Sequence, residues 1–234
     1  MMRRLSHILL ITVFALILPS SLHANINGLP LKNLPKQSLL YDYLEINHID
    51  LLGEIILLPE ESFDHHEVAA ILSRFDALPE SILRKVIEER IYVSLFNGKL
   101  TDNPSARNLS GITPRGYNLG KTWDEVPGVG GSKMVLVKIG SSDRGSGHGS
   151  VNLELHELAH SLDRHVYKLI REDPEFLGIW KIESKLLFPG RDYFLNFPEE
   201  YFAETFAMYY LGGEYQQLLR EIAPQTYGYI HKLK

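Results

Sequence analysis

The chain has 234 residues, of which 44% are hydrophobic and 23% are charged, and its formal net charge is −5 at pH 7. This composition is typical of a globular protein and excludes a disordered or fibrous chain. The acidic balance gives no reason to expect nucleic acid or an anionic membrane as a partner. The chain has no cysteine, which excludes disulfides, a thiol nucleophile and thiolate metal ligands, so any metal site must use His, Asp or Glu.

The N-terminus has the features of a signal peptide. Arg3 and Arg4 precede an apolar run over residues 8–18, which is too short to span a bilayer comfortably. We therefore expect removal of residues 1–24 and secretion to the periplasm or the extracellular space. The alternative is an uncleaved N-terminal anchor, because Leu22 stands where a small residue is preferred before the cut. The mature chain has no other apolar stretch of spanning length, so no membrane span is expected in it.

The first half of the chain predicts a small α/β lobe over about residues 46–149. It is preceded by an N-terminal entry segment over residues 25–45, in which the prolines and polar side chains of 25–37 predict a loose stretch. Apolar residues at three- and four-residue steps predict helices, and short apolar runs predict strands. In chain order these are a helix over 39–52, a strand over 54–58, a helix capped by Ser62, a helix opened by Pro79 and a strand over 91–96.

The middle of the chain is irregular by composition. Residues 98–131 are rich in Gly, Pro, Asn and Ser and predict either a boundary between lobes or a structured loop over a cleft. A strand is expected over 133–139, and it is a candidate for pairing with an extended peptide substrate. The glycine-rich segment 141–149 is either a loop that moves over the cleft or a simple connector. From a helix that starts near Ser150, helical patterns continue to the C-terminus and predict a mainly helical lobe over about 150–234, so the predicted fold class is α+β.

The segment His156-Glu157-Leu158-Ala159-His160 carries the strongest chemical signal. Side chains four residues apart on a helix lie on the same face, so His156 and His160 can bind one metal ion. Zinc accepts nitrogen and oxygen ligands, and three protein ligands leave a fourth position for water. Glu157 projects about 100° around the helix and can contact that water. The alternative is an exposed helix on which His and Glu occur by chance.

A third ligand is expected from the helix that Pro198 opens. Glu200 and Glu204 lie four residues apart on one face, so one can bind the metal while the other accepts the N–H of a ligand ring. For Glu199 and Glu200 the alternative is simple compensation of the helix dipole. Asp163, on the polar face of the first helix, is a further carboxylate expected to support the ligands.

Residues 152–163 and 199–207, which hold these motifs, together resemble the catalytic domain of anthrax lethal factor and the related secreted bacterial Pro-Pro endopeptidases. Residues 120–128 resemble a stretch that lies upstream of the zinc helix in the smaller members. The likeness extends over residues 50–215, most of the chain. It implies a zincin-like metallopeptidase fold with one Zn²⁺ ion per chain.

The resemblance also implies a role for each matching residue. It assigns the zinc ligands to His156, His160 and Glu200. It assigns the general base to Glu157, and the carboxylate behind a ligand ring to Glu204. Tyr193, seven residues before Glu200, matches a tyrosine that assists catalysis in these enzymes. Arg115 and Tyr117 fall near positions that shape proline recognition, where Tyr117 replaces the Trp of the family pattern. Glu199 is a candidate partner for Arg115.

These features predict a secreted zinc endopeptidase that acts on extended peptide or protein substrates, with proline-rich sites as the candidate class. Glu157 would take a proton from the zinc-bound water, and the Tyr193 hydroxyl would stabilise the oxyanion. Two alternatives stay open: a binding or toxin-like protein that keeps the zincin fold without catalysis, and a structural zinc site. The intact Glu157 disfavours the first, and the absence of a clear fourth ligand in the sequence disfavours the second.

Overall fold

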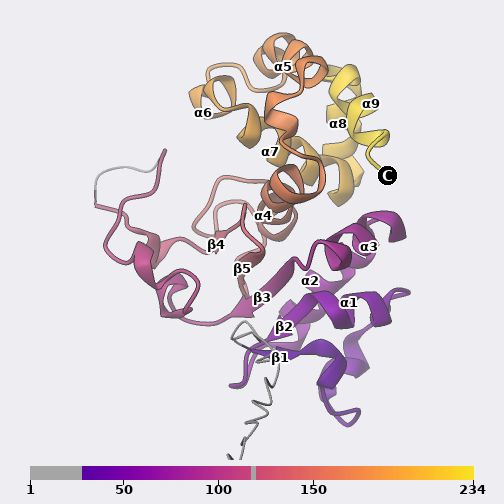
Figure 1. Cartoon of the computed structure of the whole chain (residues 1–234), viewed down its shortest axis with the longest axis vertical. Helices are drawn as coiled ribbons and strands as arrows, with labels where there is room; N and C mark the ends of the chain where they lie inside the picture. The colour runs from indigo at the N-terminus through magenta and orange to yellow at the C-terminus, as the bar shows by residue number, and fades with distance from the viewer. Residues whose placement is uncertain (1–27, 117–119) are drawn as a thin grey trace, which may run out of the picture.

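The structure, a computed structural model, describes residues 28–116 and 120–234. It has the predicted α+β architecture, with one small sheet whose strands all lie before residue 139 and a helical remainder after it (Figure 1). The predicted signal peptide over residues 1–24 and Tyr117 lie outside the described residues. Within the described ranges, no helix combines the length and the apolar character needed to cross a bilayer.

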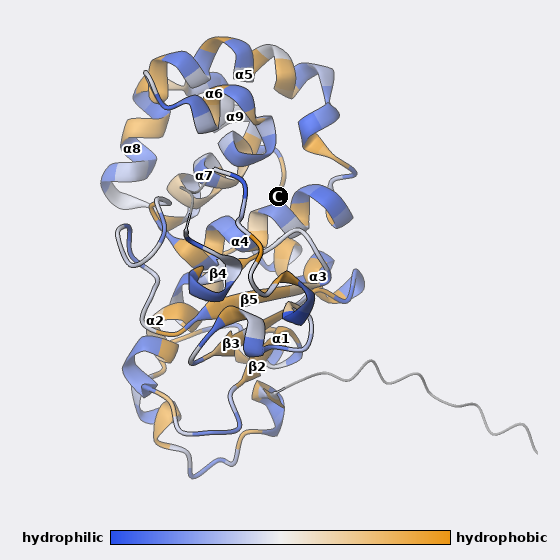
Figure 2. Cartoon of the chain, turned by 90° about the vertical axis from the view of Figure 1, so that its left-hand side faces the viewer, coloured by the Kyte–Doolittle hydropathy of each residue, from blue (hydrophilic) through white to orange (hydrophobic). Residues whose placement is uncertain are grey.

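Five short strands form the sheet in the order β1-β2-β3-β5-β4. Their bounds are β1 (Leu29–Pro30), β2 (Ile56–Leu58), β3 (Tyr92–Phe96), β4 (Gly128–Val129) and β5 (Met134–Lys138). The three central strands are parallel, while β1 and β4 run antiparallel to their neighbours at the two edges. The central strands consist mainly of buried aliphatic residues, as parallel strands covered on both faces do. Figure 2 shows these apolar strands enclosed by helices of mixed polarity.

The strand expected over 133–139 is present as β5, but it lies inside the sheet. It pairs with β3 on one side and with β4 on the other, so neither of its backbone edges is free for a substrate. The expectation that a substrate pairs with this strand is therefore wrong. The open edge on this side of the sheet belongs to β4, which is only two residues long.

The helices of the N-terminal half are α1 (Ile49–Ile55), α2 (His65–Asp76) and α3 (Glu80–Glu88). α3 follows Pro79 as predicted. The cap of α2 is Asp64 and not Ser62, because the Asp64 carboxylate accepts two backbone N–H groups of the first turn. Helix α2 then buries one apolar stripe, which consists of Val68, Ile71, Leu72 and Phe75.

Residues 28–45 are part of the fold, which corrects the expectation of a loose stretch over 25–37. They contribute β1 and two short 3₁₀ helices, Leu31–Asn33 and Leu39–Tyr43. Leu31, Leu34 and Leu40 are buried in the core. The helix predicted over 39–52 is divided into two elements. Its first part is the 3₁₀ helix Leu39–Tyr43, and its second part belongs to the α-helix α1.

The helices of the C-terminal half are α4 (Leu153–Ser161), α5 (Pro174–Leu187), α6 (Asp192–Asn196), α7 (Pro198–Leu211), α8 (Gly213–Ile222) and α9 (Pro224–His231). α4 and α7 pack against each other near the centre of the molecule (Figure 1). Every residue of α7 from Glu200 to Tyr209 is buried, so carboxylates on this helix require partners. One continuous hydrophobic core joins the sheet to these helices.

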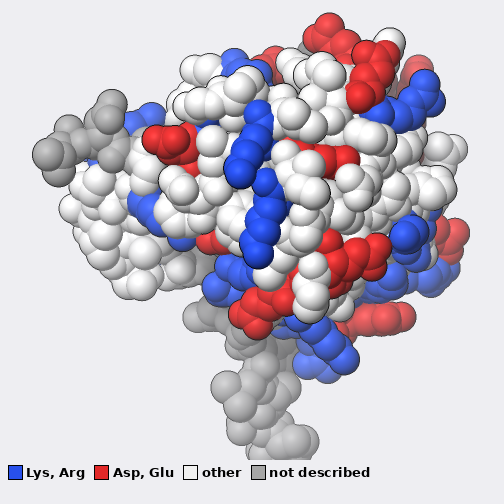
Figure 3. Space-filling view, turned by 90° about the horizontal axis from the view of Figure 1, so that it is seen from above, with Lys and Arg blue, Asp and Glu red and all other residues white. Residues whose placement is uncertain are grey.

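Helix α4, the zinc helix of the sequence prediction, differs from that prediction at both ends. Its cap is Asn152, whose side chain accepts a backbone N–H of the first turn, and not Ser150. It ends at Ser161, where a π-helical turn, Leu162–Val166, follows. Leu169, beyond this turn, has a positive φ and stands outside the helix. On the face of the molecule shown from above in Figure 3, acidic and basic side chains are interspersed.

Candidate active site

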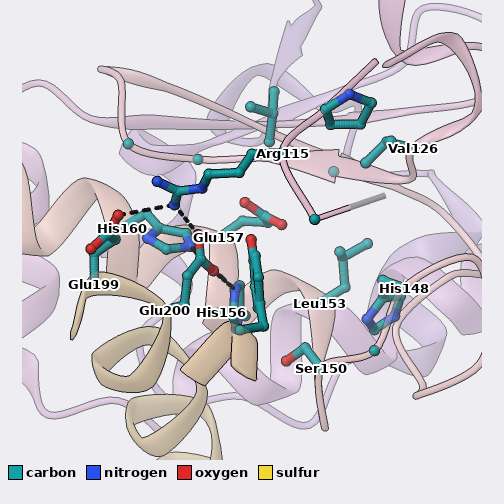
Figure 4. Close-up of a pocket in the computed structure, with 18 of the residues that line it drawn as sticks. Arg115, Val126, His148, Ser150, Leu153, His156, Glu157, His160, Glu199 and Glu200 are labelled. Carbon is teal, nitrogen blue, oxygen red and sulfur yellow. Dashed lines mark hydrogen bonds and ion pairs between the residues drawn. The ribbon is translucent and has the colours of Figure 1, made fainter. Parts of the chain in front are cut away.

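Three side chains from two helices bring their donor atoms together (Figure 4). His156 and His160 project from α4, and Glu200 projects from the first turn of α7. The two Nε2 atoms are 3.2 Å apart, and Oε2 of Glu200 lies 3.4 Å from Nε2 of His156 and 3.3 Å from Nε2 of His160. The residues that the sequence predicted as ligands thus form a nearly equilateral triangle of donor atoms.

The size of this triangle fits a tetrahedral zinc site. Ligand atoms that lie about 2.0–2.1 Å from a zinc ion are about 3.3–3.4 Å from one another in a tetrahedron. The three observed separations are 3.2, 3.3 and 3.4 Å. Two imidazole nitrogens and one carboxylate oxygen are also donors that zinc accepts, and they leave a fourth position open. Spacing and donor chemistry therefore both suit this ion.

Glu204, one turn after Glu200, orients the first ligand ring. Its Oε2 lies 3.3 Å from Nδ1 of His156, and its carboxylate is fully buried. Its Oε1 accepts the backbone N–H of Val151 at 3.1 Å and the guanidinium of Arg144 at 3.0 Å. Because Nδ1 of His156 faces Glu204, Nε2 is the ring nitrogen that faces the donor triangle and can bind a metal ion. The sequence predicted this carboxylate, but not the part of Arg144.

The carboxylates give the site a strong affinity for positive charge. Burial lowers the pKa of His156, but its contacts with Glu200 and Glu204 outweigh burial and raise that pKa to about 10. Burial raises the pKa of Glu200, but hydrogen bonds with the two rings hold that pKa far below its usual range. A metal ion entering the site therefore takes the place of a proton on His156.

Glu157 lies in the same cleft, where residues 128–131, which comprise β4 and the two glycines after it (the β4 segment), cross α4. A Cβ atom at Gly128 would lie 3.1 Å from Cγ of Glu157, and a Cβ atom at Gly130 would lie 1.9 Å from its carbonyl oxygen. Only glycine allows this close crossing. Burial raises the pKa of Glu157, while the rings of His156 and His160 lower it by less. A raised pKa suits a carboxylate that accepts a proton from water and returns it later.

Tyr193, on α6, lies beside the ligand carboxylate. Burial and the neighbouring Glu200 hold the pKa of the Tyr193 phenol well above its usual range, so the hydroxyl stays protonated and can donate a hydrogen bond. Its ring packs against Phe197, with ring centroids 5.7 Å apart. The backbone of Gly116 also packs closely against the Tyr193 ring, because a Cβ atom at Gly116 would lie 2.7 Å from Cε2 of that ring. The structure therefore places this tyrosine in the site.

Arg115 joins the two carboxylates at the start of α7. Its Nη2 lies 2.9 Å from Oε1 of Glu199 and 3.0 Å from Oε1 of Glu200, and its guanidinium lies 3.9 Å from the centroid of the Phe197 ring. Because Oε1 of Glu200 binds Arg115, Oε2 is the atom that faces the two rings. The predicted pair of Arg115 with Glu199 is present, and the contact with Glu200 was not predicted. Tyr117 lies outside the described residues.

Asp163 does not support the ligands in the way we expected. Its buried carboxylate pairs with the guanidinium of Arg171 and accepts the backbone N–H of the same residue at 3.2 Å. Within residues 28–116 and 120–234, no contact joins it to His156 or His160. The π-helical turn after Ser161 changes the spacing of side chains around the axis, so Asp163 leaves the polar face of the helix.

These residues line a cleft of about 760 Å³. Its walls come from the β4 segment, the loop at 114–116, the glycine-rich loop at 145–149 and the helices α4, α6 and α7. Many of the lining residues are glycines, which expose backbone groups to the cleft. His148 belongs to one wall, and its Nε2 bonds the carbonyl of Ser141 at 2.8 Å. Whether the glycine-rich loop moves or only connects stays a prediction.

Comparison with known proteins identifies the family. The family model for the anthrax toxin lethal factor, N- and C-terminal domain, matches residues 44–233. The chain belongs to this family. Among its relatives, a Pro-Pro endopeptidase from Clostridioides difficile (strain 630) is 38% identical over 185 residues, which cover 79% of this chain and 83% of the relative. A Pro-Pro endopeptidase from Paenibacillus alvei is 36% identical over 184 residues, which cover 78% of this chain and 84% of the relative.

The solved structures agree with this assignment of the chain to the lethal factor family. The structure of the Pro-Pro endopeptidase PPEP-2 from Paenibacillus alvei matches with a TM-score of 0.75 and 36% identity, over 79% of this chain and 100% of that chain. The family resemblance and the fold class predicted from the sequence are confirmed. This lethal factor family member is an endopeptidase of the hydrolase class, and the comparisons give no support to a binding protein without catalysis.

Proposed function

We propose that the protein is a zinc-dependent endopeptidase that cleaves extended polypeptides at proline-containing sites outside the cytoplasm. The observation that carries the proposal is the donor triangle of His156, His160 and Glu200, with Glu157 beside it in the cleft. Relatives named Pro-Pro endopeptidases support proline-containing substrates. The apolar N-terminal run over residues 8–18 supports export.

Each protein group has a defined task in this reaction. Zinc, when bound, supplies a Lewis acid that polarises water and the scissile carbonyl. Glu157 accepts a proton from the attacking water and delivers it to the leaving amine. Tyr193, protonated at neutral pH, donates a hydrogen bond to the carbonyl oxygen as its negative charge develops. Glu204 keeps His156 in the tautomer that binds metal, and Arg115 holds Glu200 by its other oxygen.

The open edge of β4 is suited to an extended substrate backbone. The carbonyl of Pro127 accepts the N–H of Lys138 at 2.8 Å, so this pair uses its hydrogen bonds within the sheet. In an antiparallel ladder, successive residues direct their N–H and C=O groups alternately toward the partner strand and away from it. Gly128 follows Pro127, so its N–H and C=O point away from β5. These groups are placed to pair with a peptide that lies along the cleft.

A peptide library with proline before, after or on both sides of each bond tests this function. We expect cleavage only at bonds flanked by proline, because the related enzymes are named for such bonds. A chelator should abolish the cleavage and one equivalent of zinc should restore it, since a zinc site with three protein ligands exchanges its metal with solution. Mass spectrometry of the products gives the bond that is cut. Cleavage that survives removal of the metal, or that ignores proline, would contradict the proposal.

A further inference from the structure

Basic side chains line the cleft at both ends of the zinc helix α4. At its C-terminal end, Nη1 of Arg164 donates to the carbonyl of Gly131 at 3.0 Å. At its N-terminal end, Arg191 faces the glycine-rich loop, where a Cβ atom on Gly149 would lie 3.6 Å from Nη2. Figure 4 shows this second end, where Leu153, Ser150 and His148 lie together on the side of His156 away from His160.

Arg191 is positioned without a polar partner of its own. It is exposed, and its guanidinium lies 4.9 Å from the centroid of the buried Phe194 ring, which supports the charge over the cleft. Arg115 and Arg171, in contrast, each pair with carboxylates. Within the described part of the chain, no hydrogen bond or ion pair engages the Arg191 guanidinium. Its N–H groups are therefore available to a ligand, and their planar arrangement matches a carboxylate.

The charges around Arg191 favour the same kind of ligand. The carboxylates that line the cleft, Glu157, Glu199 and Glu200, all belong to the metal site or to its partner Arg115. The loop beside Arg191 carries a second positive charge, because Nζ of Lys121 donates to the carbonyl of Gly147 at 3.0 Å. This end of the cleft is thus locally basic in a chain whose net charge is −5. A basic cleft end attracts acidic groups.

The direction of β4 indicates which part of a substrate reaches Arg191. Gly128 lies beside Leu153 at the start of α4, and Gly131 lies beside His160 near its end, so β4 and α4 run in the same direction along the cleft. Antiparallel pairing is the more stable arrangement of two strands. A substrate antiparallel to β4 places the residues that follow the scissile bond at the Leu153 end, where Arg191 lies.

We propose that Arg191 is a specificity-determining residue that binds an acidic side chain of the substrate on the C-terminal side of the scissile bond. This inference rests on the proposed peptidase function and deepens it, because it names acidic polypeptides as the substrate class.

Peptides that share one proline-containing core and differ at a single position test the proposal. Glu, Gln or Lys is placed in turn at each position before and after the cut, and all C-termini are amidated so that only side chains supply the charge. At one position after the cut, we expect Glu to exceed Gln in kcat/KM by about three- to tenfold, the range of a charge-assisted hydrogen bond in a partly exposed site. Arg191→Gln should remove this preference, and Arg191→Glu should shift it to Lys.

Arg164→Gln is the matched control, because it removes the same charge at the opposite end of the cleft and should keep the preference for Glu. A preference that survives Arg191→Gln, that is lost equally in Arg164→Gln, or that occurs only before the cut overturns the proposal. Binding of the same peptides to the Glu157→Gln chain, measured by fluorescence anisotropy, gives a readout without cleavage. If the wild-type chain cuts none of the peptides while Arg191-dependent binding of Glu remains, the peptidase function fails and the acidic subsite stands. If peptides are cut without preference, only the subsite fails.

Discussion

Glu157→Gln is expected to lower kcat for peptide cleavage by about 10²–10⁴-fold, the usual contribution of a general acid–base group. An amide cannot accept the proton of the attacking water. Zinc should remain at one ion per chain, because Glu157 is not among the three donors that face one another. Glutamine also has nearly the same shape, so the close packing against Gly128 is kept. Steady-state kinetics and elemental analysis of zinc in the same preparation measure both effects.

A second carboxylate of the cleft provides the matched control for this variant. Glu199→Gln makes the same chemical change, but Glu199 contacts Arg115 and does not belong to the donor triangle. We expect a much smaller loss of kcat from it. An active Glu157→Gln protein would exclude Glu157 as the base, and loss of zinc from that protein would mean that its carboxylate holds the metal.

Among the glycine-to-alanine changes, Gly130→Ala should be the most damaging, because its added Cβ atom makes the closest contact. The new Cβ atom would lie 1.9 Å from the carbonyl oxygen of Glu157 and 2.7 Å from the carbonyl carbon, far closer than non-bonded atoms approach. Either the β4 segment or α4 must shift, and both line the cleft. We expect a loss of about 1–3 kcal/mol in the free energy of unfolding, as for an overpacked core, with a fall in kcat/KM of about 10²-fold or more. Urea unfolding and peptide kinetics test the two effects.

Gly178→Ala is a control for the added methyl group itself. Gly178 lies within α5, and a Cβ atom there meets no atom within 4 Å. Alanine in a helix interior should therefore stabilise the protein by about 0.5–1 kcal/mol. A Gly130→Ala protein with wild-type unfolding and kinetics would show that β4 does not cross α4 as closely as the structure indicates.

Much of the site could be predicted because its residues belong to regular, local patterns. Helical spacing alone places His156 and His160 on one face of α4, and a proline followed by two glutamates marks the first turn of α7. The near-complete burial of α7 explains why the face shared by Glu200 and Glu204 had to meet another polar face, that of α4. The division of roles between these two carboxylates was available only from the family resemblance.

Other features depend on contacts between distant segments and left no local signal. Arg144 binds Glu204 across 60 residues, from a loop whose composition indicates only flexibility. β4 is two residues long and begins with Gly128, so no strand pattern marks the edge of the sheet. Asp163 followed the helical spacing of the sequence, but the π-helical turn after Ser161 changes that spacing. Such departures arise from tertiary packing, which overrides local propensity.

The central claim, a single zinc ion held by His156, His160 and Glu200, is tested most directly by anomalous X-ray diffraction at the zinc absorption edge. Crystals of the wild-type protein grown with one equivalent of zinc supply the data. We expect one anomalous peak per chain, bonded to Nε2 of both histidines and to Oε2 of Glu200. A map without a peak at these atoms, or with its peak at other residues, would contradict the claim.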